Sequence, residues 1–195
     1  MEHYFTEEST SPSEPREIKL FYNGRAYPFI TDHGVFSKDR LDFGTEVMLK
    51  ASMDRLEGSV LDLGCGYGPV GVLVNLERGL SCHMVDINRR ALELARRNLK
   101  LNRAEGRVFY SDGFSEIEDK YNYILFNPPI RRGKELIYGL FSQAREHLKE
   151  GGSLIIVIQK KQGMASARKK LEELYERVEI LDKKAGYYVL EASLE

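Results

Sequence analysis

The chain has 195 residues, a length that fits one domain with a short appendage and excludes a second domain of full size. Hydrophobic residues make up 42% and charged residues 30%, which argues against a chain that is disordered throughout or collagen-like. Lys and Arg total 29 against 30 Asp and Glu. A protein that binds nucleic acid through bulk charge alone is far more basic, so any such binding must use one face.

The N-terminal part of the chain predicts an arm followed by a hairpin. Residues 7–17 are rich in Ser, Pro, Thr and Glu and have no apolar periodicity, which is typical of a flexible arm. Asn23-Gly24 separates two alternating apolar runs and predicts a tight turn, because both central positions of such a turn need positive φ. A helix is predicted over 45–56, with Thr45 as its cap. We therefore expect an arm and hairpin extension over residues 1–44 and a separate domain over 45–195.

From Ser59 onward, short apolar strands alternate with helices. The predicted strands span residues 60–63, 81–85, 108–110, 123–126, 154–158, 178–181 and 187–190, and the predicted helices 69–77, 88–101, 134–148 and 164–175. This alternation predicts an open α/β sheet with helices on both faces. Such sheets bind ligands beyond the carboxyl ends of their strands. Polar residues stand at four of those ends, namely Asp62, Asp86, Asp112 and Asn127.

The loop after the first of these strands is rich in glycine. Its pattern, Gly64-Cys65-Gly66-Tyr67-Gly68, differs from the Gly-x-Gly-x-x-Gly of dinucleotide-binding loops, and Asp62 stands two residues before it. A carboxylate disfavours a pyrophosphate and favours a ligand that carries positive charge, such as the sulfonium and ammonium groups of S-adenosylmethionine. A tight turn without a ligand is the alternative. Cys65 is expected to be a small filler here, since no base stands near it in sequence.

Two further acidic residues each have a functional and a purely local interpretation. Asp86 could accept the hydroxyl groups of a ribose, or cap the helix that begins near Asn88. Asp112 could accept from an adenine amino group, or form an Asx turn with Gly113. The ligand interpretation is favoured because all of these residues stand at strand ends.

Asn127-Pro128-Pro129 ends the fourth of these strands abruptly, because proline cannot donate to a strand ladder. A rigid corner would fix the Asn127 side-chain carbonyl and the Pro128 backbone carbonyl as two converging acceptors. This pair suits an exocyclic amino group, which has two hydrogens to donate. The expected contribution to catalysis is positioning and electrostatics, without a strong base. A simple strand terminator is the alternative.

These motifs resemble those of the class I S-adenosylmethionine-dependent methyltransferases that act on amino groups. The segments 32–37, 41–45 and 159–163 further resemble the guanine-N2 methyltransferases of small-subunit ribosomal RNA and their single-domain archaeal-type homologues. The resemblance covers roughly residues 30 to 190 and implies a Rossmann-like fold, with a mostly parallel seven-stranded sheet whose last strand is antiparallel. It makes 45–195 the domain that binds S-adenosylmethionine.

The resemblance also implies roles for individual residues. The cofactor site would comprise Asp62, Gly64, Cys65, Gly66, Gly68, Asp86, Ile87, Asp112, Gly113 and Asn127. The catalytic corner would comprise Asn127, Pro128 and Pro129, and the substrate site Phe36, Thr45, Ile130, Arg131, Arg132, Lys134 and Lys160. Two features depart from the family. Ile130 replaces the usual aromatic residue, so another ring, Phe36 or Tyr67, is expected to stack on the target base, and the bacterial enzymes carry an additional N-terminal domain of similar fold.

The basic segments favour RNA as the substrate. Arg131-Arg132-Gly133-Lys134 and Lys160-Lys161 would border the cleft, whereas Arg89-Arg90 and the run 168–170 are expected to be solvated helix faces paired with Glu. The leading hypothesis is methylation of guanine N2 in ribosomal RNA. The alternatives are N5 methylation of a protein glutamine, methylation of a small-molecule amine, a non-catalytic binding protein, and a nicotinamide dehydrogenase.

The sequence gives no sign of a metal site, a signal peptide or a membrane span. Cys65 and Cys82 are too few for a disulfide framework, and no Cys or His stands at zinc-finger spacing. The N-terminus has no basic segment followed by an apolar core, and runs such as 154–158 are too short to span a bilayer. We expect a cytoplasmic protein without metal or membrane partners, either a monomer or a homodimer.

Overall fold

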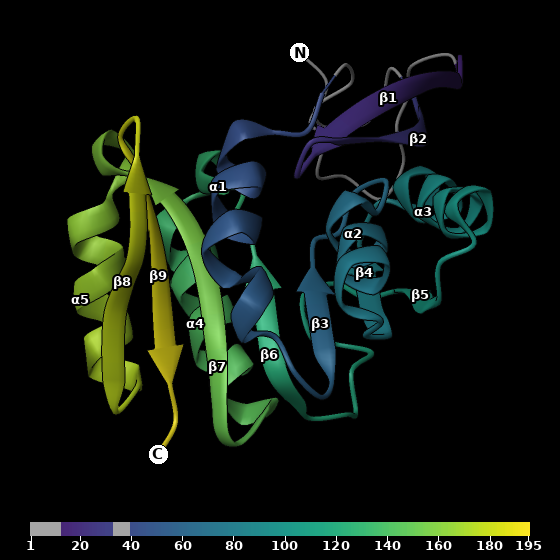
Figure 1. The fold of residues 1–195 in the computed structure, drawn as a ribbon. Coiled ribbons are helices and arrows are strands. Elements are labelled where there is room, and N and C mark those ends of the chain that lie inside the picture. Colours follow the sequence, from purple (N-terminus) through teal and green to yellow (C-terminus); the bar gives the residue numbers. More distant parts are fainter. Residues whose placement is uncertain (1–12, 33–39) are drawn as a thin grey trace.

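The computed structural model describes residues 13–32 and 40–195 (Figure 1). The strands are β1 (Arg16–Tyr22), β2 (Arg25–Thr31), β3 (Val60–Leu63), β4 (Cys82–Asp86), β5 (Gly106–Tyr110), β6 (Tyr121–Phe126), β7 (Leu148–Gln159), β8 (Arg177–Lys184) and β9 (Tyr187–Ser193). The α-helices are α1 (Phe43–Ser52), α2 (Pro69–Arg78), α3 (Arg89–Asn102), α4 (Lys134–Glu146) and α5 (Met164–Leu174). Short 3₁₀ helices are η1 (Met53–Arg55), η2 (Ile130–Arg132) and η3 (Lys160–Gln162). Over the described ranges, no helix has both the length and the apolar character needed to cross a bilayer.

Seven strands form one sheet in the order β5-β4-β3-β6-β7-β9-β8. Strands β5, β4, β3, β6 and β7 are parallel to one another, and β9 runs antiparallel to both of its neighbours. The predicted fold is therefore confirmed, including the antiparallel last strand and the N-terminal hairpin. From β3 the chain moves outward to β4 and β5 and then returns to β6 on the other side of β3. This reversal opens a crevice at the carboxyl ends of β3 and β6, where ligands bind in sheets of this kind.

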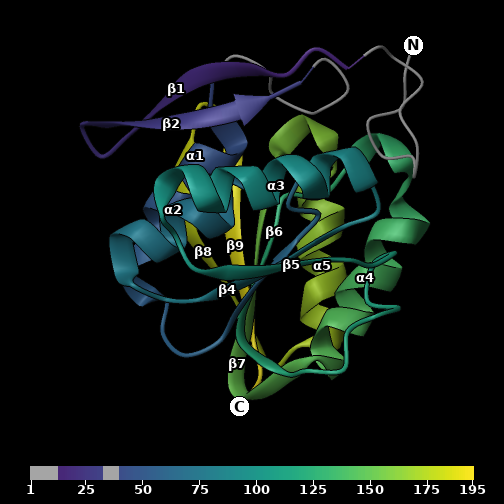
Figure 2. The same ribbon diagram turned by 90° about the vertical axis from the view of Figure 1, so that its right-hand side faces the viewer.

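Helices cover both faces of the sheet (Figures 1 and 2). One hydrophobic cluster joins α1, α2, α3 and the hairpin to the sheet, and a second cluster joins α4 and α5 to its other face. Gly71 allows α2 to lie close to β4, because a Cβ at that position would stand 2.2 Å from the Sδ atom of Met84. The apolar stripes of the helices thus fix the sheet between two layers.

The hairpin of β1 and β2 is tied to the large sheet through α3. Its turn has positive φ at Asn23 (47°) and Gly24 (74°), as the Asn-Gly pair predicts. The buried Asn98 side chain of α3 donates from Nδ2 to the carbonyls of Ile30 and Tyr67, both at 2.8 Å, and its Oδ1 accepts from the Ile30 N–H at 2.6 Å. One amide therefore links the hairpin, a helix and the glycine loop.

Two boundaries differ from the predictions. Helix α1 begins at Phe43 with Asp42 as its N-cap, whereas we predicted a start at Thr45. The helix predicted over 134–148 ends at Glu146, and Gly151-Gly152 lie within the long strand β7 that follows it. The pairing of β6 with β7 shifts register between Tyr121 and Tyr123, which accommodates the glycines as an irregularity in the strand.

Candidate active site

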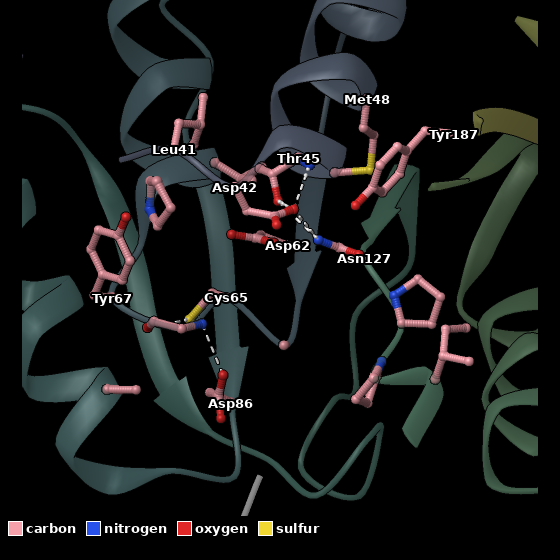
Figure 3. Close-up of a pocket in the computed structure, with 18 of the residues that line it drawn as sticks. Leu41, Asp42, Thr45, Met48, Asp62, Cys65, Tyr67, Asp86, Asn127 and Tyr187 are labelled. Carbon is pink, nitrogen blue, oxygen red and sulfur yellow. Dashed lines mark hydrogen bonds between the residues drawn. The ribbon is translucent and has the colours of Figure 1, made fainter. Parts of the chain in front are cut away.

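A cavity of about 550 Å³ lies at the carboxyl ends of β3, β4 and β6, between α1 and the glycine loop (Figure 3). A smaller cavity of about 90 Å³ adjoins it and shares Gly64, Asp86, Asn127 and Pro129. Figure 3 shows Asp42, Thr45 and Asn127 meeting on one side of the larger cavity, with Asp62 beside them and Asp86 lower down. Three of the four polar strand ends therefore line one cavity, and Asp112 lines the smaller one.

The glycine loop presents bare backbone to the larger cavity. Gly64 and Gly66 line it with φ of +73° and +56°, and a Cβ added at either position would meet nothing within 4 Å. Open space beside left-handed backbone is the geometry that a closely approaching ligand needs. Gly68 serves packing, since a Cβ there would stand 3.0 Å from that of Ala95 on α3. Cys65 is buried in the cavity wall, where burial raises the pKa of its thiol and so disfavours the nucleophilic thiolate.

Asp62 is a buried carboxylate with one oxygen that lacks a partner. Its side chain is 4% exposed, and Oδ2 finds no hydrogen-bond donor in the described part of the chain. Burial, together with the nearby charge of Asp86, raises the pKa of Asp62 to about 8. A buried carboxylate in this state is stabilised by a donor that carries positive charge. The site therefore fits a ligand with an ammonium group.

Asp86 holds the glycine loop in place. Its Oδ2 accepts from the Gly66 N–H and its Oδ1 from the Asn88 N–H, both at 2.8 Å. Burial raises the pKa of Asp86, and these two hydrogen bonds oppose that rise. The cap of α3 is Asn88, whose side chain accepts from the Ala91 N–H at 3.1 Å. Asp86 is therefore not the helix cap, and its carboxylate keeps a lone pair for a further donor.

Asn127 is held in one orientation by the N-terminus of α1. Its Nδ2 donates to Asp42 Oδ2 and to Thr45 Oγ1, each at 3.0 Å. Asp42 also caps α1, since Oδ2 accepts from the Thr45 N–H at 2.9 Å and from Thr45 Oγ1 at 3.2 Å. A carboxylate can only accept, so the amide nitrogen of Asn127 must face Asp42. The amide oxygen of Asn127 is left for another donor in the cavity that this residue lines.

The two prolines form a tight corner after β6. Pro129 has φ −74° and ψ 77°, close to an inverse γ-turn, and the Ile130 N–H donates to the Pro128 carbonyl at 2.9 Å. The Pro128 carbonyl therefore retains one lone pair for a second donor. The corner is a tight turn, and one of its two expected acceptors, the Pro128 carbonyl, already accepts one hydrogen bond.

The other predicted site residues divide between the two cavities. Those in the wall of the larger cavity are Thr45, Ile130 and Arg131, and those in the wall of the smaller one are Ile87, Asp112, Gly113 and Arg132. Asp112 is exposed, and its backbone makes a turn with Ser115. Gly68, Lys134 and Lys160 line neither cavity. Phe36 lies outside the described residues.

Asp42 and Tyr187 line the larger cavity, although the sequence patterns assigned neither of them a role. The signal for Asp42 was present, because Asp42 and Thr45 both suit a helix cap and we chose Thr45. Tyr187 comes from the start of β9 and packs edge-on against Phe43, with ring centroids 5.4 Å apart. Gly44 permits this approach, since a Cβ there would stand 2.9 Å from the Tyr187 ring.

The profile of the methyltransferase small domain matches residues 26–191 of this chain. The chain belongs to the methyltransferase small domain family. The match begins inside the hairpin and ends in β9, so it covers the whole sheet and both cavities. The family predicted from the glycine loop and the Asn-Pro-Pro corner is confirmed.

Two curated relatives of this methyltransferase small domain protein have the same sequence identity to it but align over different shares of their length. The uncharacterized protein YbxB of Bacillus subtilis is 40% identical over 98% of both chains. The ribosomal RNA small subunit methyltransferase C of Haemophilus influenzae is 40% identical over 72% of this chain and 46% of its own length. The chain thus spans less than half of the ribosomal RNA methyltransferase that it matches.

A solved structure of a ribosomal RNA methyltransferase also resembles this chain over about half of its own length. The Thermus thermophilus 16S rRNA N2 G1207 methyltransferase, in complex with AdoMet and guanosine, superposes with a TM-score of 0.83 and 26% identity. The superposition covers 94% of this chain and 52% of that one. A Methanocaldococcus jannaschii tRNA m1G37 methyltransferase, at 21% identity and a TM-score of 0.64, shares the fold.

Proposed function

We propose that this protein transfers the methyl group of S-adenosylmethionine to N2 of a guanine in small-subunit ribosomal RNA. The observation that carries the proposal is the orientation of Asn127, whose amide nitrogen is bound by Asp42 and Thr45 while its oxygen remains available in the cavity. The names of the Thermus and Haemophilus proteins, which specify N2 of a 16S guanine and small-subunit rRNA, support the choice of substrate. A ribosomal RNA substrate also supports a cytoplasmic location.

The cofactor fits the residues around the glycine loop. Asp62 would accept from the ammonium group, Gly64 and Gly66 would let the ligand lie against backbone, and Asp86 would accept from ribose hydroxyls. The unpartnered oxygen of Asp62 and the open space at the two glycines support this assignment. Ile87, Asp112 and Gly113 would border the adenine in the smaller cavity, together with their shared neighbour Asn127. When bound, S-adenosylmethionine supplies an electrophilic methyl group.

The Asn-Pro-Pro corner would act on the amine. The lone pair of an exocyclic nitrogen is delocalised into the ring. The amino group is therefore coplanar with the base, and in this state its nitrogen is a poor nucleophile. When Asn127 Oδ1 and the Pro128 carbonyl accept its two hydrogens, the lone pair is freed and can be aimed at the methyl carbon. The carboxylate of Asp42 strengthens the Asn127 oxygen as an acceptor, because a hydrogen bond donated by the amide nitrogen polarises the amide. The proton released by the methylated amine would pass to water.

Tyr187 is suited to replace the aromatic ring that the family usually carries where this chain has Ile130. It is partly exposed in the wall of the larger cavity, and its edge contact with Phe43 fixes the ring. Tyr67, the alternative, is 2% exposed and packs edge-on against Phe29, with centroids 6.1 Å apart. We therefore propose that Tyr187 stacks on the target base, a contact worth about 1–3 kcal/mol.

The test is to identify the methylated product. The protein is incubated with methyl-labelled S-adenosylmethionine and, in separate reactions, deproteinised small-subunit rRNA, intact small subunits and a ribosome-free protein extract. RNA is then digested to nucleosides and compared with an N2-methylguanosine standard. Label in N2-methylguanosine, absent with Asn127→Ala, is the expected result. Label in another nucleoside, or in glutamine of a protein, would overturn the proposed substrate.

A further inference from the structure

The outward face of α3 carries a line of positive charge. Five exposed basic side chains lie along this face or at its end. One acidic residue of α3, Glu93, lies between them. We call these five the α3 basic face: Arg89, Arg96, Arg97, Lys100 and Arg103. Because the chain as a whole has a net charge of −1, this concentration of charge is a local feature and not a property of the composition.

The basic run 168–170 on α5 forms ion pairs with Glu, as predicted, and in the run Arg89-Arg90 on α3 the guanidinium of Arg90 lies 3.9 Å from the carboxylate of Asp32. On α5, Arg168 lies 2.8 Å from Glu172, and Lys170 lies 3.1 Å from Glu173. On α3, by contrast, Arg97, Lys100 and Arg103 form no ion pair with a carboxylate anywhere in residues 13–32 and 40–195. These three side chains of the α3 basic face therefore present charge that no carboxylate of the described residues neutralises.

Neighbouring groups hold part of this charge in place. The guanidinium of Arg89 lies over the Tyr110 ring at 4.5 Å from its centroid, and Arg107, on the edge strand β5, lies over Phe109 at 5.0 Å. Arg96 donates to the Val108 carbonyl at 3.1 Å. A guanidinium that is held over a ring loses less entropy when it binds a phosphate.

The α3 basic face starts at the active site. Helix α3 follows directly from Asp86 and Asn88, and Ala91 in its first turn lines the larger cavity. Figure 2 shows α3 crossing the front of the molecule below the hairpin, with β5 beside it. At 1.5 Å per residue, the face extends about 20 Å from the cavity, enough for several nucleotides of a single strand.

We propose that the α3 basic face binds the phosphates of the RNA segment that flanks the target nucleotide. The inference rests on the proposed function, because it takes RNA as the substrate. The α3 basic face is distinct from the predicted substrate residues. Those residues, which follow β6 and β7, lie on the other side of the switch point between β3 and β6 and are Arg131, Arg132, Lys134 and Lys160. Phosphate contacts carry no sequence information, so this face contributes affinity and orientation while the cavity selects the base.

The test compares two triple variants that each remove three positive charges. Arg97→Gln, Lys100→Gln and Arg103→Gln are combined on α3, and Arg168→Gln, Lys169→Gln and Lys170→Gln on α5 form the matched control. The Kd for an in-vitro-transcribed small-subunit rRNA fragment is measured from 0.05 to 0.4 M KCl. Losing three phosphate contacts to a single strand lowers the slope of log Kd against log salt by about 2. If the salt plots converge near 1 M, this difference is about a 100-fold weaker Kd at 0.1 M salt.

We expect this change in the α3 variant alone, with the Kd for S-adenosylhomocysteine unchanged in all three proteins. Equal slopes for wild type and the α3 variant, or equal losses in both variants, would overturn the proposal. Phosphatidylserine vesicles serve as a further arm. Loss of vesicle binding by the α3 variant with an unchanged RNA slope would assign the face to a membrane and also overturn it. If the slopes differ as expected but no RNA is methylated, the proposed function fails while RNA binding by α3 stands.

Discussion

Replacing Asp42 with Asn tests whether the N-terminus of α1 positions Asn127. Asn has the shape of Asp and caps helices equally well, so α1 is retained. What changes is the acceptor for Asn127 Nδ2, now 3.0 Å from a charged oxygen. Hydrogen bonds to charged groups contribute roughly 1.5–3 kcal/mol and neutral ones about 0.5–1.5 kcal/mol. The restraint on Asn127 should therefore weaken by about 1–1.5 kcal/mol, close to tenfold in rate.

The measurement is the single-turnover rate of methyl transfer to small-subunit rRNA, with cofactor saturating. We expect a rate about tenfold lower for Asp42→Asn and a Kd for S-adenosylhomocysteine within about twofold of wild type, because Asn127 acts on the amine. Asp54→Asn is the control, since this side chain lies in η1, just beyond the end of α1, and is fully exposed. An unchanged rate for Asp42→Asn, or a cofactor affinity that falls with the rate, would refute the reasoning.

Three further perturbations test the cofactor site and its support. Asp86→Ala should raise the apparent KM for S-adenosylmethionine by at least about tenfold, because two charge-assisted acceptors are lost. The single-turnover rate at saturating cofactor should stay close to that of wild type. An unchanged KM would show that Asp86 does not bind the ribose. Since the pKa of Asp62 is about 8 in the free protein, a cationic ligand that needs its charged form should bind more tightly as pH rises from 6 to 8, by up to about tenfold per unit, and Asp62→Asn should abolish that dependence. The raised pKa of Asp62 also lowers the free energy of unfolding of the ligand-free protein. This cost grows from pH about 4, where Asp62 ionises in the unfolded chain, to pH about 8, where it ionises in the folded protein. Asp62→Asn should therefore become more stable relative to wild type as pH rises through that window. Asn98→Leu should lower the free energy of unfolding by about 3 kcal/mol and speed tryptic cleavage in the hairpin, because it leaves the backbone groups of Ile30 unpaired, whereas the more exposed Asn102→Ala should do neither.

The fold and much of the cavity could be predicted because they depend on local patterns. Parallel strands end at one edge of a sheet, so the polar residues that follow them must lie near one another. Asp62, Asp86 and Asn127 indeed line one cavity. The hairpin turn and the confirmed sheet class follow from Asn-Gly and from strand–helix alternation in the same way.

The parts that could not be predicted depend on contacts between distant segments. The bond between Asp42 and Asn127 joins residues 85 positions apart, and no local pattern distinguishes Asp42 from Thr45 as the cap. Tyr187 reaches the cavity because β9 inserts between β7 and β8, which brings the start of β9 to α1. The charge of Arg97, Lys100 and Arg103 on α3 was not singled out for a similar reason, since ion pairing depends on which residues face one another in space.

The central claim is that the Asn127 amide oxygen orients an amine for methyl transfer. It is tested most directly by the single-turnover rate of Asn127→Ala on small-subunit rRNA, measured beside the Kd for S-adenosylhomocysteine. Removing one oriented polar group of this kind costs about 100-fold or more in rate. We predict such a loss with the Kd within about twofold of wild type. A variant that methylates RNA at the wild-type rate, or one that loses cofactor binding to the same extent as activity, would contradict the account.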